Sequence, residues 1–329
     1  MRQIFADAWR LTWSHKWWWI LGFAALMITS SIGYQIIAQG ITSITEPLIW
    51  WERWQSWAQG MSPIDFFQAQ WAILLKDPET WFRAIFVWTI MLGIFLLGLS
   101  FSIYSIATLI SAAKLKQLNG IDSMILALRE AKPSFKGVFW AVVLSLIAIN
   151  VYLLAFSLPV IMLGINQGFW STALLYTLFL LFAVGAFALS SVIMYVIQFI
   201  VVEQEKLANS ILLAWGLFKR YWVITLEMFA LQLGFGLLVA GAIFLLVSLI
   251  TVPVTIVGAI LVAQRLFDLT VFLPQLTLFI LFLIMIIGLS AYSVFNLYSW
   301  TFLFMRFKEI HPKSRIAAWI ELKLLSQEL

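Results

Sequence analysis

Long runs without charge alternate with short segments of mixed polar and apolar character along the whole chain. A helix rises about 1.5 Å per residue, so about 20 residues cross the ~30 Å hydrocarbon core of a bilayer. Six runs meet this length, at about residues 17–39, 84–113, 138–163, 170–202, 222–250 and 276–305, and only the fifth contains a charged residue, Glu227. The pattern therefore predicts an all-α protein, a polytopic membrane bundle of six transmembrane helices.

The segment before the fifth run has a different pattern. Apolar residues follow helical spacing along one side of it: Leu207, Ile211, Ala214, Trp215 and Phe218. Asn209 and Arg220 lie away from that side, whereas Leu213 is an apolar exception. An amphipathic helix of this kind is expected to lie in the membrane interface. Similar interfacial helices are predicted at residues 1–16 and 122–132, and a looser one at 316–324.

Two stretches interrupt the alternation. Residues 41–80 are rich in tryptophan, with charges and prolines between the rings. They are interpreted as helices lying on the membrane surface or, alternatively, as a lid or partner-docking surface. Pro253 interrupts the apolar run after the fifth span, and 254–263 is too short to cross again. A loop or partly re-entrant segment is predicted there.

Small residues mark one face of the second span. Gly98 and Ser102 stand four residues apart, as do Ala107 and Ser111. Small side chains at this spacing let helices approach closely in membranes. This face is therefore predicted to lie inside the bundle.

Composition agrees with the membrane assignment. Hydrophobic residues make up 63% of the chain and charged residues only 11%, against about 25% charged in soluble domains. The net charge of +5 comes from basic residues beside the apolar runs, which favours orientation in a bilayer over nucleic-acid binding. There is no cysteine, so thiolate chemistry is excluded. The first residues lack a signal-peptide pattern, so the first span is expected to be retained.

The distribution of basic residues predicts the orientation. Most lysines and arginines fall in the segments before odd-numbered spans and in the tail, and Arg53, Lys76, Arg83 and Arg265 fall on the other side. Because basic loops remain in the cytoplasm, the sequence predicts a multi-pass protein of the cell membrane. Both termini are expected to be cytoplasmic.

The interfacial segments are also similar to one another. Residues 123–127 align with 210–214, and this places Lys132 on Lys219, while AWRL at 8–11 is similar to AWGL at 214–217. The chain is interpreted as three parallel two-span repeats, at about 1–113, 120–202 and 207–305, unlike the inverted repeats of many transporters. They form a membrane domain at 1–310, and a cytoplasmic amphipathic tail follows at 311–329. Alternatively, any even-spanning protein with amphipathic cytoplasmic loops would share part of this pattern.

The motif VVEQEKLANSILLAWGLFKRYW, at residues 201–222, is part of a wider resemblance. Residues 1–310 resemble the six-span membrane domain fused ahead of some glycerophosphodiester phosphodiesterases, and related uncharacterised prokaryotic membrane proteins. The resemblance implies a membrane domain of the same kind. The soluble phosphodiesterase domain is missing from this sequence, so hydrolase activity is not expected and a lipid-linked role does not follow from the resemblance.

Polar side chains inside predicted spans are the candidate intramembrane site. They are Glu227, Asn150, Gln198, Gln232 and Asn296. Glu227 is interpreted as a partner of Lys219 or Arg220 or, alternatively, as a proton or substrate group. The amides serve interhelical hydrogen bonds or, alternatively, a polar pathway. Glu203 and Glu205 are expected to cap the next helix or to pair with Lys206.

No catalytic motif is present, and His15 and His311 lack neighbouring metal ligands, so neither a cofactor nor a metal is expected. The predicted function is a non-catalytic membrane component that organises lipid or a protein partner at its cytoplasmic face. Candidate contacts to anionic headgroups or a partner are Lys132, Lys206, Trp215, Lys219 and Arg220. The alternatives are a permease or exporter subunit and an intramembrane lipid enzyme, for which the sequence lacks a catalytic pair.

Overall fold

The computed structural model describes residues 1–26, 78–115, 121–165, 169–264 and 267–309, and these residues form helices joined by turns. The helices are α1 (Arg2–Ser14), α5 (Pro78–Lys114), α6 (Ile121–Ala131), the 3-10 helix η1 (Lys132–Ser134), α7 (Phe135–Ile165), α8 (Phe169–Val202), α9 (Leu207–Ala263) and α10 (Phe267–Glu309). Residues 18–26 are also helical. The Trp-rich insert, the predicted tail helix and most of the first predicted span lie outside the described residues.

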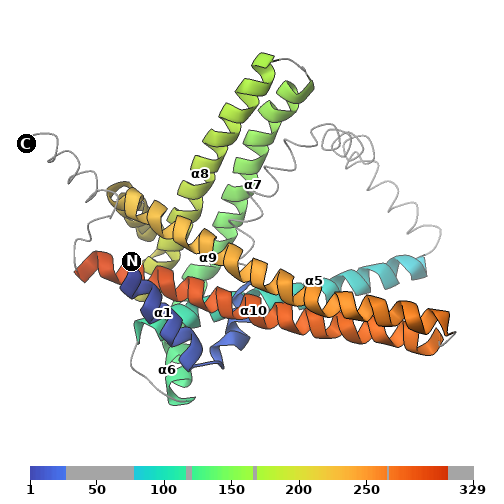
Figure 1. Cartoon of the computed structure of the whole chain (residues 1–329). Coiled ribbons are helices and arrows are strands. Elements are labelled where there is room, and N and C mark those ends of the chain that lie inside the picture. Colours follow the sequence, from blue (N-terminus) through green and yellow to red (C-terminus); the bar gives the residue numbers. More distant parts are fainter. Residues whose placement is uncertain (27–77, 116–120, 166–168, 265–266, 310–329) are drawn as a thin grey trace, which may run out of the picture.

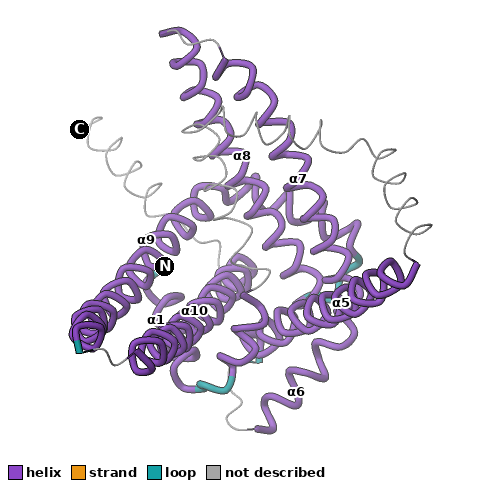
Figure 2. The backbone as a smooth tube through the Cα atoms, turned by 90° about the vertical axis from the view of Figure 1, so that its right-hand side faces the viewer, coloured by secondary structure: helices purple, strands orange, loops and turns teal. Residues whose placement is uncertain are grey.

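The long helices extend from one shared region. Helices α7 and α8 form one antiparallel pair and α9 and α10 form another, and the two pairs diverge with α5 as a further arm (Figures 1 and 2). We call the shared region the base. It comprises α1, α6, η1, residues 203–220 and the ends of α5, α7, α8 and α10 that meet them.

The buried core lies at the base. It contains the inner half of α5 and the inner ends of α8 and α10, with fully buried Ile103, Ile106, Ile110, Tyr195, Ile200, Tyr298, Leu303 and Phe304. The outer halves of the arms instead expose large apolar side chains, such as Trp88, Leu97, Leu238, Leu249 and Phe279. Continuous apolar surface of this extent is typical of contact with lipid.

Five helices of the described part are long and apolar enough to cross a membrane. The described part is thus all-α, and the chain has the make-up of a multi-pass membrane protein. Helices α5, α7 and α8 agree with the second, third and fourth predicted spans within a few residues. The sixth predicted span begins later than α10, which starts at Phe267 and contains Pro274.

The predicted loop at Pro253 is wrong. Helix α9 continues through Pro253 to Ala263 without a break at the proline. Proline removes one backbone hydrogen bond, but the apolar sequence on both sides leaves the chain no better-solvated alternative to helix. The length of the apolar run, rather than the proline within it, therefore determines where this helix ends.

Helix α9 does break at Tyr221, whose backbone is non-helical with φ −124° and ψ 25°. This kink separates residues 207–220 from the long apolar part, where the sequence predicts the change from interfacial helix to span. The Tyr221 ring stacks on Phe307 of α10, with centroids 4.6 Å apart. Leu207 and Ile211 are partly buried and Ala214 is fully buried, whereas Trp215 is 46% exposed.

Each short helix of the base packs on a different long helix. Helix α6 packs on α5, where the Tyr104 hydroxyl donates to the Leu128 carbonyl at 2.6 Å. The start of α9 packs on α8, and α1 packs on α10. The last contact includes the edge-on ring pair of Phe5 and Phe295 and a 2.9 Å hydrogen bond from Arg306 to Gln3.

Two glycines report how closely these helices approach. A Cβ at Gly22 would lie 2.5 Å from the Ser290 carbonyl oxygen, so residues 18–26 pack directly on the α10 backbone. On the small-residue face of α5, Ser102 and Ser111 are buried as predicted. Gly98 has no atom within 4 Å of its Cβ position, so that face leaves the core there.

Candidate functional site

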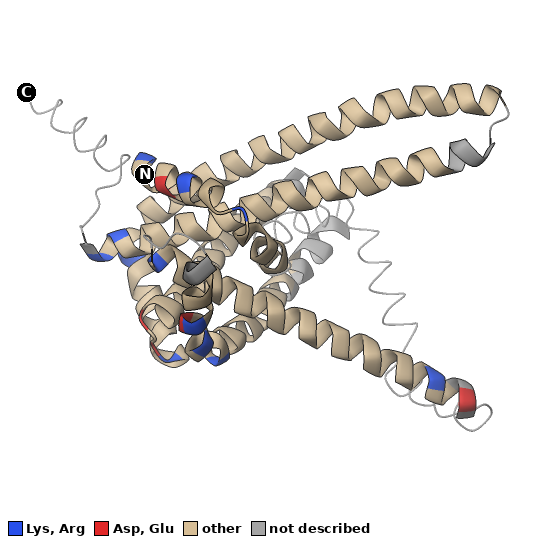
Figure 3. Cartoon of the chain, turned by 90° about the horizontal axis from the view of Figure 1, so that it is seen from below, with Lys and Arg blue, Asp and Glu red and all other residues tan. Residues whose placement is uncertain are grey.

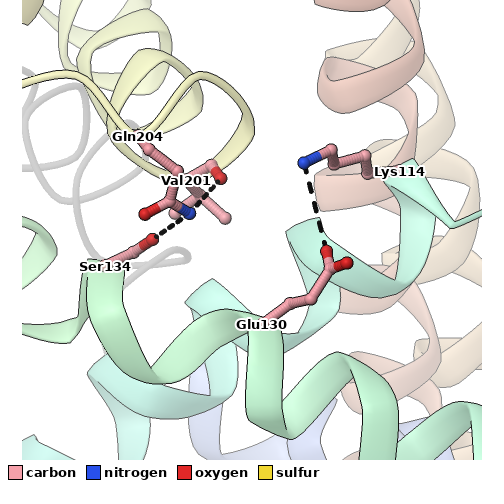
Figure 4. A network of polar contacts seen from close by, with 5 residues as sticks. All are labelled: Lys114, Glu130, Ser134, Val201 and Gln204. Carbon is pink, nitrogen blue, oxygen red and sulfur yellow. Dashed lines mark hydrogen bonds and ion pairs between the residues drawn. The ribbon is translucent and has the colours of Figure 1, made fainter.

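The turn between α8 and α9 is tied to the start of α7. Gln204 has φ 58°, in the left-handed region, and this turns its side chain toward η1. Its Nε2 donates to the Ser134 Oγ at 2.9 Å and to the Val201 carbonyl at 3.1 Å (Figure 4). One amide therefore joins the ends of two neighbouring segments at the base.

The same turn is tied to α10 by an ion pair. The Lys308 ammonium lies 2.6 Å from the Glu203 carboxylate, and the Glu205 carboxylate accepts a hydrogen bond from Asn209 at 2.7 Å. Neither Glu203 nor Glu205 therefore forms the predicted ion pair with Lys206. Lys206 is the N-cap residue of α9, and its side chain forms no capping hydrogen bond. A longer pair, Lys114 with Glu130 at 4.0 Å, links α5 to α6 (Figure 4).

The predicted headgroup or partner contacts lie on the outside of the base. Lys132 and Lys206 are exposed and form no ion pair with another described residue. On residues 207–220, the Lys219 ammonium lies 5.1 Å from the centre of the Trp215 ring, and the Arg220 guanidinium lies 5.4 Å from that of Tyr221. Cation–π contacts of this kind hold the Lys219 and Arg220 side chains in place, and their positive charges remain available to a headgroup or a partner.

A second cluster, which we call the polar seam, lies between α8, α9 and α10. The Tyr195 and Thr225 hydroxyls are hydrogen-bonded at 2.7 Å, and Gln198 donates to Thr301 at 3.2 Å. All four side chains are buried. The seam joins three helices that are long and apolar enough to cross a membrane, and it does so through neutral groups.

Several buried polar atoms of α8, α9 and α10 have no hydrogen-bond partner among the described residues. They are the Gln198 Oε1, Glu227 Oε2, Gln232 Nε2, Asn296 Oδ1 and Tyr298 hydroxyl, and the hydroxyls of Ser191, Ser290 and Ser299. Each unpaired buried polar group costs about 1–3 kcal/mol. Such groups commonly bind an internal water or a polar ligand.

The structure separates Asn150 from the other predicted intramembrane residues. Gln198, Gln232, Glu227 and Asn296 belong to α8, α9 and α10 and each has a buried polar atom. Asn150 lies exposed on α7, and its amide donates to the Leu146 carbonyl of its own helix. Glu227 forms no ion pair with Lys219 or Arg220 in the described part of the chain.

Sequence reasoning missed the residues that complete both clusters. Ser134 and Gln204 are 70 residues apart, and Gln198 and Thr301 are 103 apart. No local spacing connects such pairs, and a positive φ at a glutamine leaves no sequence signal. The one available signal was that polar residues recur along α10 in an otherwise apolar run.

Among the described residues, no group of three or more His, Cys, Asp or Glu side chains is placed to hold a metal ion. No protein-family model, curated protein or solved structure matches this chain.

Proposed function

We propose that this chain is a non-catalytic membrane component that organises anionic lipid around its base, with the base and both termini on the cytoplasmic side. The arrangement of charge carries the proposal. Basic residues of the described part gather at the base (Figure 3), and Arg83, beside Glu79 at the far end of α5, is the exception. Anionic lipids of the inner leaflet attract such a surface by about 1 kcal/mol for each basic side chain.

The repeat interpretation supports the same proposal. In the three proposed units, each short helix lies on the last long helix of another unit, in the order α6 on α5, the start of α9 on α8, and α1 on α10. A ring of three interfacial helices would present their basic residues around the whole base.

A comparison of lipids tests this function. The protein is reconstituted in nanodiscs of phosphatidylcholine with or without phosphatidylglycerol, and its thermal midpoint and retained lipids are measured. We expect phosphatidylglycerol to raise the midpoint and to be retained preferentially. Replacing Lys132, Lys206, Lys219 and Arg220 together with glutamine should remove this preference, and added salt should weaken it.

Arg83→Gln is the control, because it removes one cation from the far end of α5. It should keep the preference for phosphatidylglycerol. The proposal fails if phosphatidylglycerol has no effect on the unsubstituted protein, or if the fourfold variant retains the full preference. The second of these outcomes, a fourfold variant that retains the full preference, is the one expected if the basic surface binds a cytoplasmic protein partner instead of lipid.

The polar seam favours one second candidate, a permease or exporter subunit, because unpaired polar atoms recur along α8, α9 and α10. A water-filled path would make these positions accessible. The chain has no cysteine, so Ser191→Cys and Ser299→Cys provide single labelling sites. Reaction of both with a small water-soluble thiol reagent in vesicles would support transport, whereas protection of both would exclude it.

A further inference from the structure

A hollow of about 170 Å³ lies between α7, α8 and the first turns of α9. Small side chains on one face of α7 create it, because Ala141, Ser145 and Ala148 follow helical spacing. The opposing walls are longer apolar side chains: Leu189, Val192, Ile193 and Val196 from α8, and Leu207 and Ile211 from α9. The hollow is therefore formed by three proposed spanning or interfacial segments.

The lining selects for hydrocarbon. Ser145 is the one polar side chain in it, and its hydroxyl already donates to the Val142 carbonyl at 2.7 Å. An apolar cavity of about 150 Å³ remains dry and accepts a benzene-sized molecule. Water thus has no hydrogen-bond partner here, and the lining favours an apolar occupant.

The hollow opens toward the lipid-facing surface. Leu144, which lines it, is 48% exposed, and the neighbouring Ile147 is 55% exposed. At the other end, Lys206 directly precedes the lining residue Leu207 and forms no ion pair with another described residue. The nearby Glu205 carboxylate is already bonded to Asn209. An apolar chain in the hollow would thus have a free cation close to one end.

We propose that this hollow holds a segment of one acyl chain of a membrane phospholipid, with the lipid phosphate near Lys206. The assignment of the headgroup rests on the proposed lipid-organising function, whereas the assignment of the chain rests on the hollow itself. An extended peptide segment fits less well, because the lining offers no hydrogen-bonding group to a backbone. The opening toward the lipid-facing surface and the cation that precedes Leu207 favour a lipid over a helix of a second copy.

Photolabelling tests the site directly. The full chain is placed in phosphatidylcholine vesicles with a trace of phosphatidylglycerol that carries a diazirine in its acyl chain, and the labelled peptides are mapped after irradiation. We expect adducts to concentrate at residues 141–148, 189–196 and 207–211, and excess unlabelled lipid to abolish them. Labelling of the exposed outer surface of α10, at 276–287, should be weaker and should not saturate.

A pair of matched substitutions completes the test. Ala148→Leu fills the hollow and should lower labelling there several-fold, whereas Ala240→Leu, on the exposed surface of α9, should leave it unchanged. Even, non-saturable labelling of the unsubstituted protein would overturn the proposal whether or not the variants fold. Disulfide-linked dimers of a Leu144→Cys variant would indicate a second copy in the hollow and would also overturn it.

The two proposals fail in distinguishable ways. If a phosphatidylcholine probe labels the hollow as strongly as the phosphatidylglycerol probe, the acyl-chain site stands and the anionic preference fails. If the base prefers phosphatidylglycerol while the hollow is not enriched in label, the lipid-organising function stands and the acyl-chain site fails.

Discussion

At Gly22 the amino-terminal segment packs directly on the backbone of α10. Because a Cβ there would meet the Ser290 carbonyl oxygen at 2.5 Å, Gly22→Ala should push residues 18–26 away from α10. Overpacking of this kind costs about 1–3 kcal/mol, and the thermal midpoint in detergent should fall. Gly216→Ala is the control, because its Cβ would meet nothing within 4 Å and alanine favours helix by about 0.5–1 kcal/mol. Equal midpoints for the two variants would contradict the close approach.

Gln204 makes a second prediction at this scale, because its φ of 58° is unfavourable for any residue with a Cβ. Alanine and glycine at 204 both lose the bonds to Ser134 and Val201, but only alanine keeps the left-handed strain. Gln204→Gly should therefore be more stable than Gln204→Ala by about 1 kcal/mol, measured by chemical unfolding. At Glu205, where φ is not positive, the order of the two substitutions should reverse. If the glycine and alanine variants rank in the same order of stability at positions 204 and 205, the left-handed backbone of Gln204 does not explain the difference.

At the scale of elements, the pair of Glu203 and Lys308 fastens the α8–α9 turn to the end of α10. A double-mutant cycle with Glu203→Gln and Lys308→Gln should give a coupling of up to about 1 kcal/mol that falls with salt. The coupling is expected to be measurable because the Glu203 side chain is only 17% exposed, and this burial limits the screening of its charge by solvent. The reference cycle is Glu79 with Arg83, whose side chains are about three-quarters exposed. If the coupling between Glu203 and Lys308 is no larger than that between Glu79 and Arg83, the ion pair does not fasten the turn to α10.

The sequence predicted the elements better than their contacts. Charge-free runs and amphipathic spacing are local properties, so the α5, α7 and α8 spans and the change of character near Tyr221 were readable. Pro253 was misleading, because the loss of one hydrogen bond does not end a helix in an apolar stretch. The partners of Gln204, Gln198 and Gly22 lie far away in the sequence, so their roles required the folded base. Of the four seam residues, the sequence singled out Gln198, whereas its partner Thr301 and the pair of Tyr195 and Thr225 carried no signal.

At the scale of the whole molecule, the proposed orientation puts the base in the cytoplasm and the far ends of the helix pairs outside. Because the chain has no cysteine, single cysteines report their side unambiguously. In cells, Glu79→Cys and Gln264→Cys should react with a membrane-impermeant thiol reagent, whereas Asn209→Cys should react only after permeabilisation. All three native residues are exposed, so accessibility within the fold is matched. The inverse labelling pattern would reverse the orientation.

The contact of α1 with α10 also determines the order in which the base can be completed during biosynthesis. The ribosome delivers α1 before every other described helix and α10 after them, yet Phe5 and Gln3 find their partners only on α10. Trp9 of α1 can already meet Phe235 of α9, but Phe5 and Gln3 lack their partners until the last helix has been inserted. The base is consequently completed late, and a nascent chain arrested before α10 would present to the cell's quality-control proteases a helix that the finished protein covers.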